Sequence, residues 1–80
     1  MTYNAVLKIV QEEMFDILDL PPNSPFDPKN RFDDYGAVSI DIVTIVSCCM
    51  RRLEVRVARE DLMQAGSIGE LAEVFHTAVG

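Results

Sequence analysis

Ser39 is the residue in this chain that is best placed for covalent chemistry. It follows Gly36-Ala37-Val38 and opens a segment, residues 40–53, that contains no Gly or Pro. A hydroxyl at the start of a helix lies beside backbone N–H groups and the positive end of the helix dipole, which would stabilise a phosphate attached to it. Serine is also a favoured helix N-cap without any further role. Position alone leaves both interpretations open, with the N-cap favoured.

The other reactive side chains do not form a catalytic set. His76 is the single histidine and no cysteine is near it in sequence, so a nucleophile and base pair is not predicted. Cys48 and Cys49 are adjacent, which matches neither the spacing of a zinc site nor that of a Cys-x-x-Cys redox motif. We interpret both as small apolar helix residues in a reducing cytoplasm. The sequence therefore predicts neither an enzyme nor a metal site.

Composition and charge restrict the class of protein. A chain of 80 residues with a hydrophobic fraction of 49% suits one folded domain, residues 1–80. Thirteen acidic against seven basic residues give a net charge of −6, which excludes nucleic acid as a partner and with it a helix-turn-helix DNA binder. The uncharged residues 42–50 are too few for the roughly 20 needed to span a bilayer. We expect a cytoplasmic monomer without membrane insertion.

The elements that position Ser39 begin with an amphipathic helix. Over residues 3–18 apolar side chains recur at helical spacing, and the central row is Val6, Val10, Met14 and Ile17. Pro21 and Pro22 end this helix. Residues 23–34 contain further prolines and several Asp residues, which predicts a long irregular loop anchored by Phe26, Phe32 and Tyr35.

A second helix is predicted over residues 40–53. Its apolar row is Val43, Val46, Met50 and Leu53, flanked by Ile42, Ile45 and Cys49. Ser39 would be its N-cap, and Asp41 in the first turn and Arg51 in the last would each complement the helix dipole.

Two further helices complete the prediction. After a short extended connection that contains Val55 and Val57, residues 59–65 are long enough for a helical turn or two, closed by Gly66 as C-terminal cap. Ser67 and Glu70 form a capping box that opens a last helix reaching Ala78. Its inward residues would be Leu71, Val74, Phe75 and Val79. The predicted fold class is all-α: a small four-helix bundle of three main helices and one short one.

The residues around Ser39 carry a family resemblance. The stretch Asp34-Tyr35-Gly36-Ala37-Val38-Ser39-Ile40-Asp41 resembles the attachment motif of acyl carrier proteins, which reads Asp, an apolar residue, Gly, two variable residues, then Ser and Leu or Ile. The Tyr-Gly-x-x-Ser-Ile form is closest to carriers of polyketide synthases. The order of elements is similar over nearly the whole chain, down to Gly66-Ser67-Ile68 before the last helix.

The resemblance implies a function in which Ser39 is the working residue. A phosphopantetheinyl transferase would move 4′-phosphopantetheine from coenzyme A onto the Ser39 hydroxyl, and the thiol of this covalent arm would hold acyl intermediates as thioesters. The further partners would be acyl-loading, condensing or tailoring enzymes. The chain would then be a freestanding carrier in polyketide or related specialised biosynthesis.

Two departures from the family pattern define the alternatives. Val38 stands where most carriers have Asp or, in peptidyl carriers, His; this favours a second hypothesis, an unmodified carrier-like interaction module. The second helix also lacks the repeated acids of fatty acid carriers, so a carrier of fatty acid synthesis is a less favoured alternative than a specialised carrier. The residues predicted to contact partners are Ile40, Asp41, Thr44, Met50 and Arg51. For Ile40, burial against Tyr35 or the last helix is an equal expectation, and for Arg51 a solvated position at the helix end is favoured over a recognition role.

Overall fold

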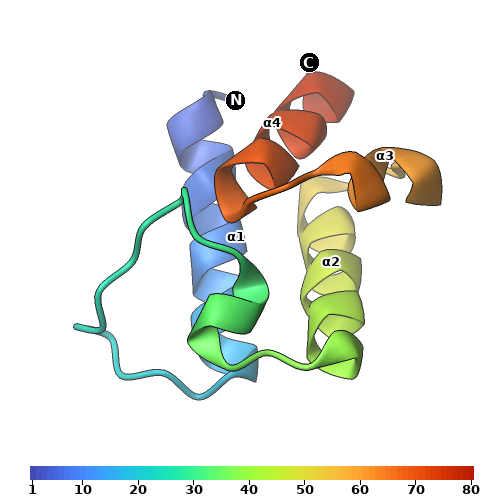
Figure 1. The fold of residues 1–80 in the computed structure, drawn as a ribbon. Coiled ribbons are helices and arrows are strands. Elements are labelled where there is room, and N and C mark those ends of the chain that lie inside the picture. Colours follow the sequence, from blue (N-terminus) through green and yellow to red (C-terminus); the bar gives the residue numbers. More distant parts are fainter.

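Four α-helices and one 3₁₀ turn make up the fold. The computed structural model describes residues 1–80. In chain order the elements are α1 (Tyr3–Ile17), η1 (Phe32–Tyr35), α2 (Ser39–Leu53), α3 (Arg59–Gln64) and α4 (Ile68–Val79) (Figure 1). The chain forms no strand, so the expected all-α bundle of three main helices and one short helix is confirmed. None of these helices has the length and apolar character needed to cross a bilayer.

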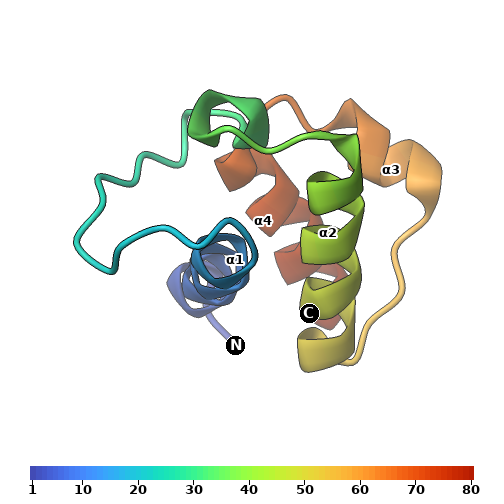
Figure 2. The ribbon, with the colours of Figure 1, turned by 90° about the horizontal axis from the view of Figure 1, so that it is seen from below.

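The core lies between α1, α2 and α4. Figure 2 shows α1 nearly end-on with α2 and α4 beside it, and α3 at the outer side of α2. The three main helices each contribute a buried apolar row: Val6, Val10 and Met14 from α1; Ile45, Val46, Cys49 and Leu53 from α2; Ile68, Leu71, Ala72 and Phe75 from α4. Burial of each large apolar side chain stabilises the fold by about 1.5–3 kcal/mol. The short helix α3 buries no residue fully.

The ends of α1 follow from its neighbouring residues. Thr2 precedes the helix and its hydroxyl accepts a hydrogen bond from the Ala5 amide at 3.1 Å. At the other end Asp19 has a positive φ of 55° and the Leu20 amide donates to the Phe15 carbonyl at 2.9 Å. The chain then enters Pro21, where the helix cannot continue. The predicted helix over residues 3–18 is therefore confirmed to within one residue.

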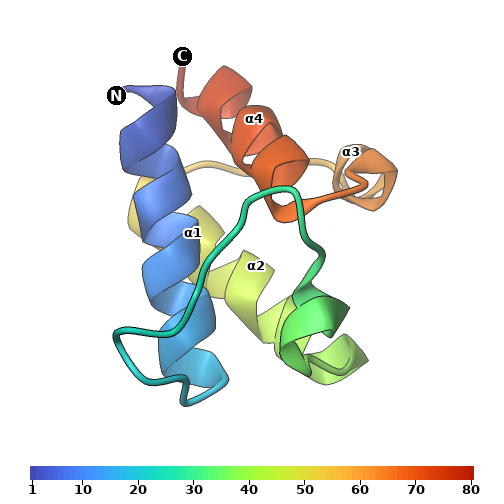
Figure 3. The ribbon, with the colours of Figure 1, turned by 60° about the vertical axis from the view of Figure 1, so that its left-hand side comes forward.

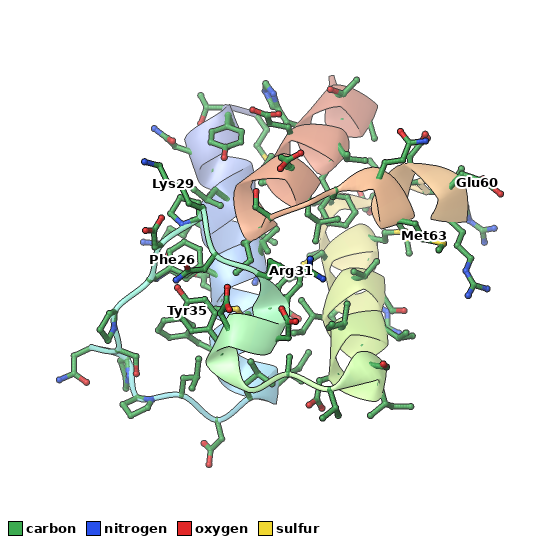
Figure 4. The ribbon with its side chains drawn as sticks, in the orientation of Figure 1. Phe26, Lys29, Arg31, Tyr35, Glu60 and Met63 are labelled. Atoms are coloured by element: carbon green, nitrogen blue, oxygen red, sulfur yellow. The ribbon has the colours of Figure 1, made fainter.

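The long loop is anchored by its aromatic residues, as predicted. The Phe26 ring stacks on Tyr35 with centroids 6.3 Å apart and meets the edge of Phe15 from α1 at 6.1 Å, and Figure 4 shows Phe26 and Tyr35 side by side beside α1. Phe32 is buried. The prediction of an irregular backbone up to residue 34 is wrong at its end. There η1 forms, because the Asp34 carboxylate accepts a hydrogen bond from the Arg31 amide at 2.8 Å.

The same loop also fixes the start of α4. Figure 3 shows it running along α1 and reaching the first turn of α4. The Asn30 carbonyl accepts from the Ile68 amide at 2.9 Å, and the Pro28 carbonyl accepts from the Gly69 amide at 2.7 Å. These amides belong to the first helical turn, which has no intrahelical acceptors. A segment distant in sequence therefore caps α4.

Two predicted helix ends differ in detail. Ser67 caps α4 by accepting from the Glu70 amide at 3.1 Å, but the Glu70 carboxylate accepts from the Ser67 hydroxyl at 3.3 Å and not from its backbone. Only half of the predicted capping box is present. Gly66 was expected to close α3 and does not, because α3 ends at Ala65 in an extended conformation. The chain leaves this short helix without needing a left-handed residue.

Candidate functional site

A glycine turn places Ser39 at the start of α2. Gly36 has φ +89°, a left-handed conformation that L side chains rarely adopt, and its amide donates to the Asp33 carbonyl at 3.1 Å. The next residue, Ala37, is buried and its amide donates to the Phe32 carbonyl at 3.3 Å. This turn redirects the chain out of η1 so that Ser39 is the first residue of α2.

The N-cap of α2 is Val38 and not Ser39, which corrects the prediction. Val38 has an extended backbone (φ −95°, ψ 173°) and its carbonyl accepts the first helical hydrogen bond, from the Ile42 amide at 3.1 Å. Valine has no side-chain acceptor for the amides of the first turn, so only one half of a capping box is present: the Asp41 carboxylate accepts from the Val38 amide at 3.1 Å. The Ser39 hydroxyl is exposed and has no hydrogen bond within the chain, so it is available for reaction.

The electrostatics of this position favour an anion on the hydroxyl. The amides of the first turn of α2 precede the helical hydrogen-bond ladder and carry the positive end of the dipole. The basic residues of α2 are both in its last turn, at Arg51 and Arg52. A phosphodiester on Ser39 would therefore lie near unpaired N–H donors, with the Asp41 carboxylate directed to Val38.

The five predicted contact residues occupy different environments. Ile40, Thr44 and Arg51 are exposed; at spacings of four and seven they share one side of α2. The expected burial of Ile40 against Tyr35 or α4 is therefore wrong. Asp41 and Met50 are half-buried. Asp41 is engaged in the cap, and Met50 lies toward α3.

A groove between α2 and α3 lies on another side of α2, and the sequence did not predict it. Its volume is about 560 Å³, and its apolar walls are Ile42, Val43, Val46, Met50, Leu62 and Met63. We call it the α2–α3 groove. Figure 4 shows Met63 projecting from α3 on the side of α2. Polar atoms of Ser47, Arg59 and Ser67 lie among its lining.

Val43 connects Ser39 with the α2–α3 groove. Val43 was predicted in the core row of α2, but it is exposed and Ile45 is buried in its place. Residues four apart share a helix face, so Val43 follows Ser39 directly along α2. The signal available in the sequence was the long apolar run of α2, which has more apolar positions than one core face needs.

The cysteines and the histidine have structural surroundings and form no part of the site around Ser39. Burial raises the pKa of the Cys49 thiol to about 12, and the negative charge of Glu13 adds to the shift. A thiol of this kind stays protonated and unreactive. Arg52 donates hydrogen bonds to the carboxylates of Glu12 and Glu13, and these bonds raise the pKa of Arg52. They join α2 to α1 at 3.0 and 3.1 Å.

His76 lies near the C-terminal end of α4, at the opposite end of the bundle from the start of α2 (Figure 1). Its Nε2 is 3.1 Å from the Met1 carbonyl oxygen, and its ring meets Tyr3 edge to face at 6.3 Å. The His76 ring thus helps to hold the N-terminus against α4. No cluster of His, Cys, Asp and Glu side chains in the chain has the arrangement of a metal site.

Comparisons with known proteins identify a family for the chain. The family model described as "Phosphopantetheine attachment site" matches residues 6–75. The chain is also similar to the polyketide biosynthesis acyl-carrier-protein AcpK of Bacillus subtilis (strain 168): 25% of residues are identical over 79 aligned positions, which cover 99% of this chain and 96% of that protein. No solved structure matches the chain.

Proposed function

The chain belongs to the phosphopantetheine-attachment family of acyl carrier proteins, and from this premise we propose that Ser39 bears the arm and that the cargo is a polyketide or a related specialised intermediate. Carriers of this family are not enzymes. They are substrates of phosphopantetheinyl transferases and of the biosynthetic enzymes that act on their cargo. When attached, 4′-phosphopantetheine supplies a thiol on a flexible arm, which raises the effective concentration of a thioester-bound intermediate at successive enzymes.

The observation that carries the assignment of Ser39 is its free, exposed hydroxyl at the first position of α2. In the transfer reaction this oxygen would form a bond to the phosphorus next to pantetheine in coenzyme A. The bond from that phosphorus to the nucleotide half breaks, adenosine 3′,5′-bisphosphate leaves, and the hydroxyl proton passes to a base of the transferase. The dipole of α2 stabilises the phosphodiester product.

The α2–α3 groove supports the proposed class of cargo. It continues the helix face that begins with Ser39 and Val43, so an arm that folds back along α2 reaches it. Its apolar walls suit an acyl chain, while the exposed side chains of Ser47 and Arg59 offer hydrogen-bond donors to carbonyl or hydroxyl groups. A cargo with oxygen substituents can use both the apolar walls and these donors, whereas a saturated fatty acyl chain can use the apolar walls alone.

The acid pattern of fatty acid carriers is absent from α2, where Asp41 is the single acid and is used for capping. We therefore propose specialised rather than general partner enzymes, with Ile40, Thr44 and Arg51 as exposed contact residues and with Met50 and Asp41 contributing at the edge of the same helix. The second candidate function, an unmodified interaction module, rests on Val38 in place of the usual acid or histidine before the serine.

An intact-mass experiment separates the two functions. The purified chain is incubated with coenzyme A and a broad-specificity phosphopantetheinyl transferase, and Ser39→Ala is the matched control. We expect a mass gain of one arm in the wild-type chain and none in Ser39→Ala. An unchanged mass with several transferases would support the unmodified module, and a gain that persists in Ser39→Ala would move the attachment site elsewhere.

A further inference from the structure

Exposed large apolar side chains are concentrated around Ser39. Five such residues are exposed in the chain, and three of them, Val38, Ile40 and Val43, lie within four residues of Ser39, with exposed fractions of 59%, 71% and 62%. We call these three residues the Ser39 collar. Apolar side chains that gather at a polar surface mark an interaction site, whereas scattered ones need no explanation.

The geometry of α2 places the collar on several sides of the hydroxyl. Val38 is the N-cap immediately before Ser39, and Ile40 is the next residue of the helix. Val43 is one turn further, four residues from Ser39 and three from Ile40, so it neighbours both. An enzyme that brings a base and a phosphate to the Ser39 oxygen must cover these side chains and remove them from water.

Charge is scarce on α2 although the chain as a whole is acidic. The chain carries −6, whereas Asp41 against Arg51 and Arg52 leaves α2 at +1. The Asp41 carboxylate is turned to the Val38 amide, 3.1 Å away. Arg51 is twelve residues from Ser39, about 18 Å along the helix axis, and Arg52 is paired with Glu12 and Glu13. No free charged group of α2 adjoins the hydroxyl.

We propose that the phosphopantetheinyl transferase recognises this chain through the apolar Ser39 collar and not through acidic residues of α2. This proposal rests on the proposed function, because it assumes that Ser39 receives the arm. The transferase surface that fits the collar is itself apolar and uncharged, since a basic surface there would lose its hydration without gaining a partner charge.

Kinetics of arm transfer test the collar, with coenzyme A and a broad-specificity phosphopantetheinyl transferase as the probe. We expect Ile40→Ser and Val43→Glu to lower kcat/KM by about tenfold or more, the loss typical of an interface anchor. Val43→Leu keeps the apolar surface and should stay within about twofold of wild type. Ala5→Ser changes an exposed apolar side chain of α1, outside both the collar and the α2–α3 groove, and should leave kcat/KM unchanged.

The sign of the effect distinguishes the collar from recognition of acids. Val38→Asp introduces the residue that most carriers have before the serine, and Asp is a better N-cap than Val, so α2 is not weakened. The collar proposal expects Val38→Asp to lower kcat/KM. A transferase that recognises acidic residues would instead show a higher kcat/KM with Val38→Asp and with Val43→Glu. A change in kcat/KM below about threefold in Ile40→Ser, or a higher kcat/KM in either acidic variant, would overturn the collar proposal.

Failure of the collar and failure of the proposed function give different results. If the wild-type chain takes the arm on Ser39 while the collar variants react at the wild-type rate, the collar proposal is wrong and the proposed attachment site stands. If the wild-type chain takes no arm, the proposed function fails and the collar proposal falls with it. Circular dichroism and urea unfolding of each variant verify that the exposed substitutions leave the fold intact.

Discussion

The Asp41 carboxylate accepts a hydrogen bond from the backbone amide of Val38 at 3.1 Å. This contact uses the single acid of α2 to hold the turn that presents Ser39. In the sequence Asp41 stood in the first turn as a complement to the helix dipole and as a candidate for partner contact. The structure gives it the additional task of satisfying the backbone amide of the N-cap residue Val38.

Removal of this cap should weaken the start of α2. We expect Asp41→Ala to lower the free energy of unfolding by about 1 kcal/mol, the usual cost of a lost helix cap. Urea unfolding followed by circular dichroism measures the change. Thr44→Ala is the control, because the Thr44 hydroxyl donates only to the Ile40 carbonyl within its own helix and its loss should cost less than about 0.5 kcal/mol. Equal losses in the two variants would contradict the capping role.

Two glycines should respond differently to alanine. A Cβ on Gly69 would lie 3.1 Å from the Pro28 carbonyl oxygen and 3.1 Å from the Tyr3 hydroxyl, so Gly69→Ala should separate the loop from α4 and cost about 1–3 kcal/mol. A Cβ on Gly66 meets only the flexible end of Glu70. We expect Gly66→Ala to be neutral or stabilising by up to about 1 kcal/mol. Thermal unfolding of both variants provides the test, and similar melting temperatures would refute the loop contact.

The ion pairs of Arg52 should contribute a small, salt-dependent stability. Arg52 bonds Glu12 at 3.0 Å and Glu13 at 3.1 Å, and its side chain remains 42% exposed. Since exposed pairs are screened, we expect Arg52→Ala to cost about 1 kcal/mol at low salt and less at 1 M salt. Arg51→Ala removes an exposed Arg that has no ion pair and should change stability little. A cost for Arg52→Ala that does not shrink with salt would indicate lost packing instead.

The Cys49 thiol should make stability fall at alkaline pH. Its pKa in the fold is about 12, above the value of 9.0 for an unperturbed thiol. The unfolded chain therefore loses this proton first, so the stability contributed by the neutral thiol is present below pH 9 and is lost as the pH rises toward 12. We expect the difference in unfolding free energy between wild type and Cys49→Ala to shrink over this range. A constant difference from pH 8 to pH 11 would contradict the assignment.

The α2–α3 groove should protect a thioester on the arm from hydrolysis. Ser47 lines the groove, so Ser47→Phe should fill it and raise the hydrolysis rate of an arm-bound acyl or β-keto acyl thioester severalfold, toward the rate on free pantetheine. Thr44→Phe places the same ring on exposed surface three residues earlier, outside the groove lining. Thioester loss followed by intact mass compares the two, and equal rates in wild type and both variants would show that the groove holds no cargo.

The sequence alone determined the helices and the family, and it indicated Ser39 as the residue proposed to bear the arm. Helical spacing in residues 3–18, Pro21 after them, and Ser67 before the last helix each fixed an element by local chemistry. Gly36 indicated the turn, and Ser39 indicated the start of α2 to within one residue, because a left-handed turn and a helix N-terminus are local properties. The attachment motif is a continuous stretch, so the family could also be read from it.

Tertiary structure decided which side of α2 faces inward. Apolar residues cover most of this helix before Arg51, so its own period does not select Ile45 for the core or leave Val43 exposed. Packing against α1 and α4 makes that choice, and it sets both the Ser39 collar and the α2–α3 groove. The sequence likewise did not predict that the carbonyls of Pro28 and Asn30 cap α4. Backbone carbonyls carry no sequence signal, and only the folded chain brings them to their partner amides.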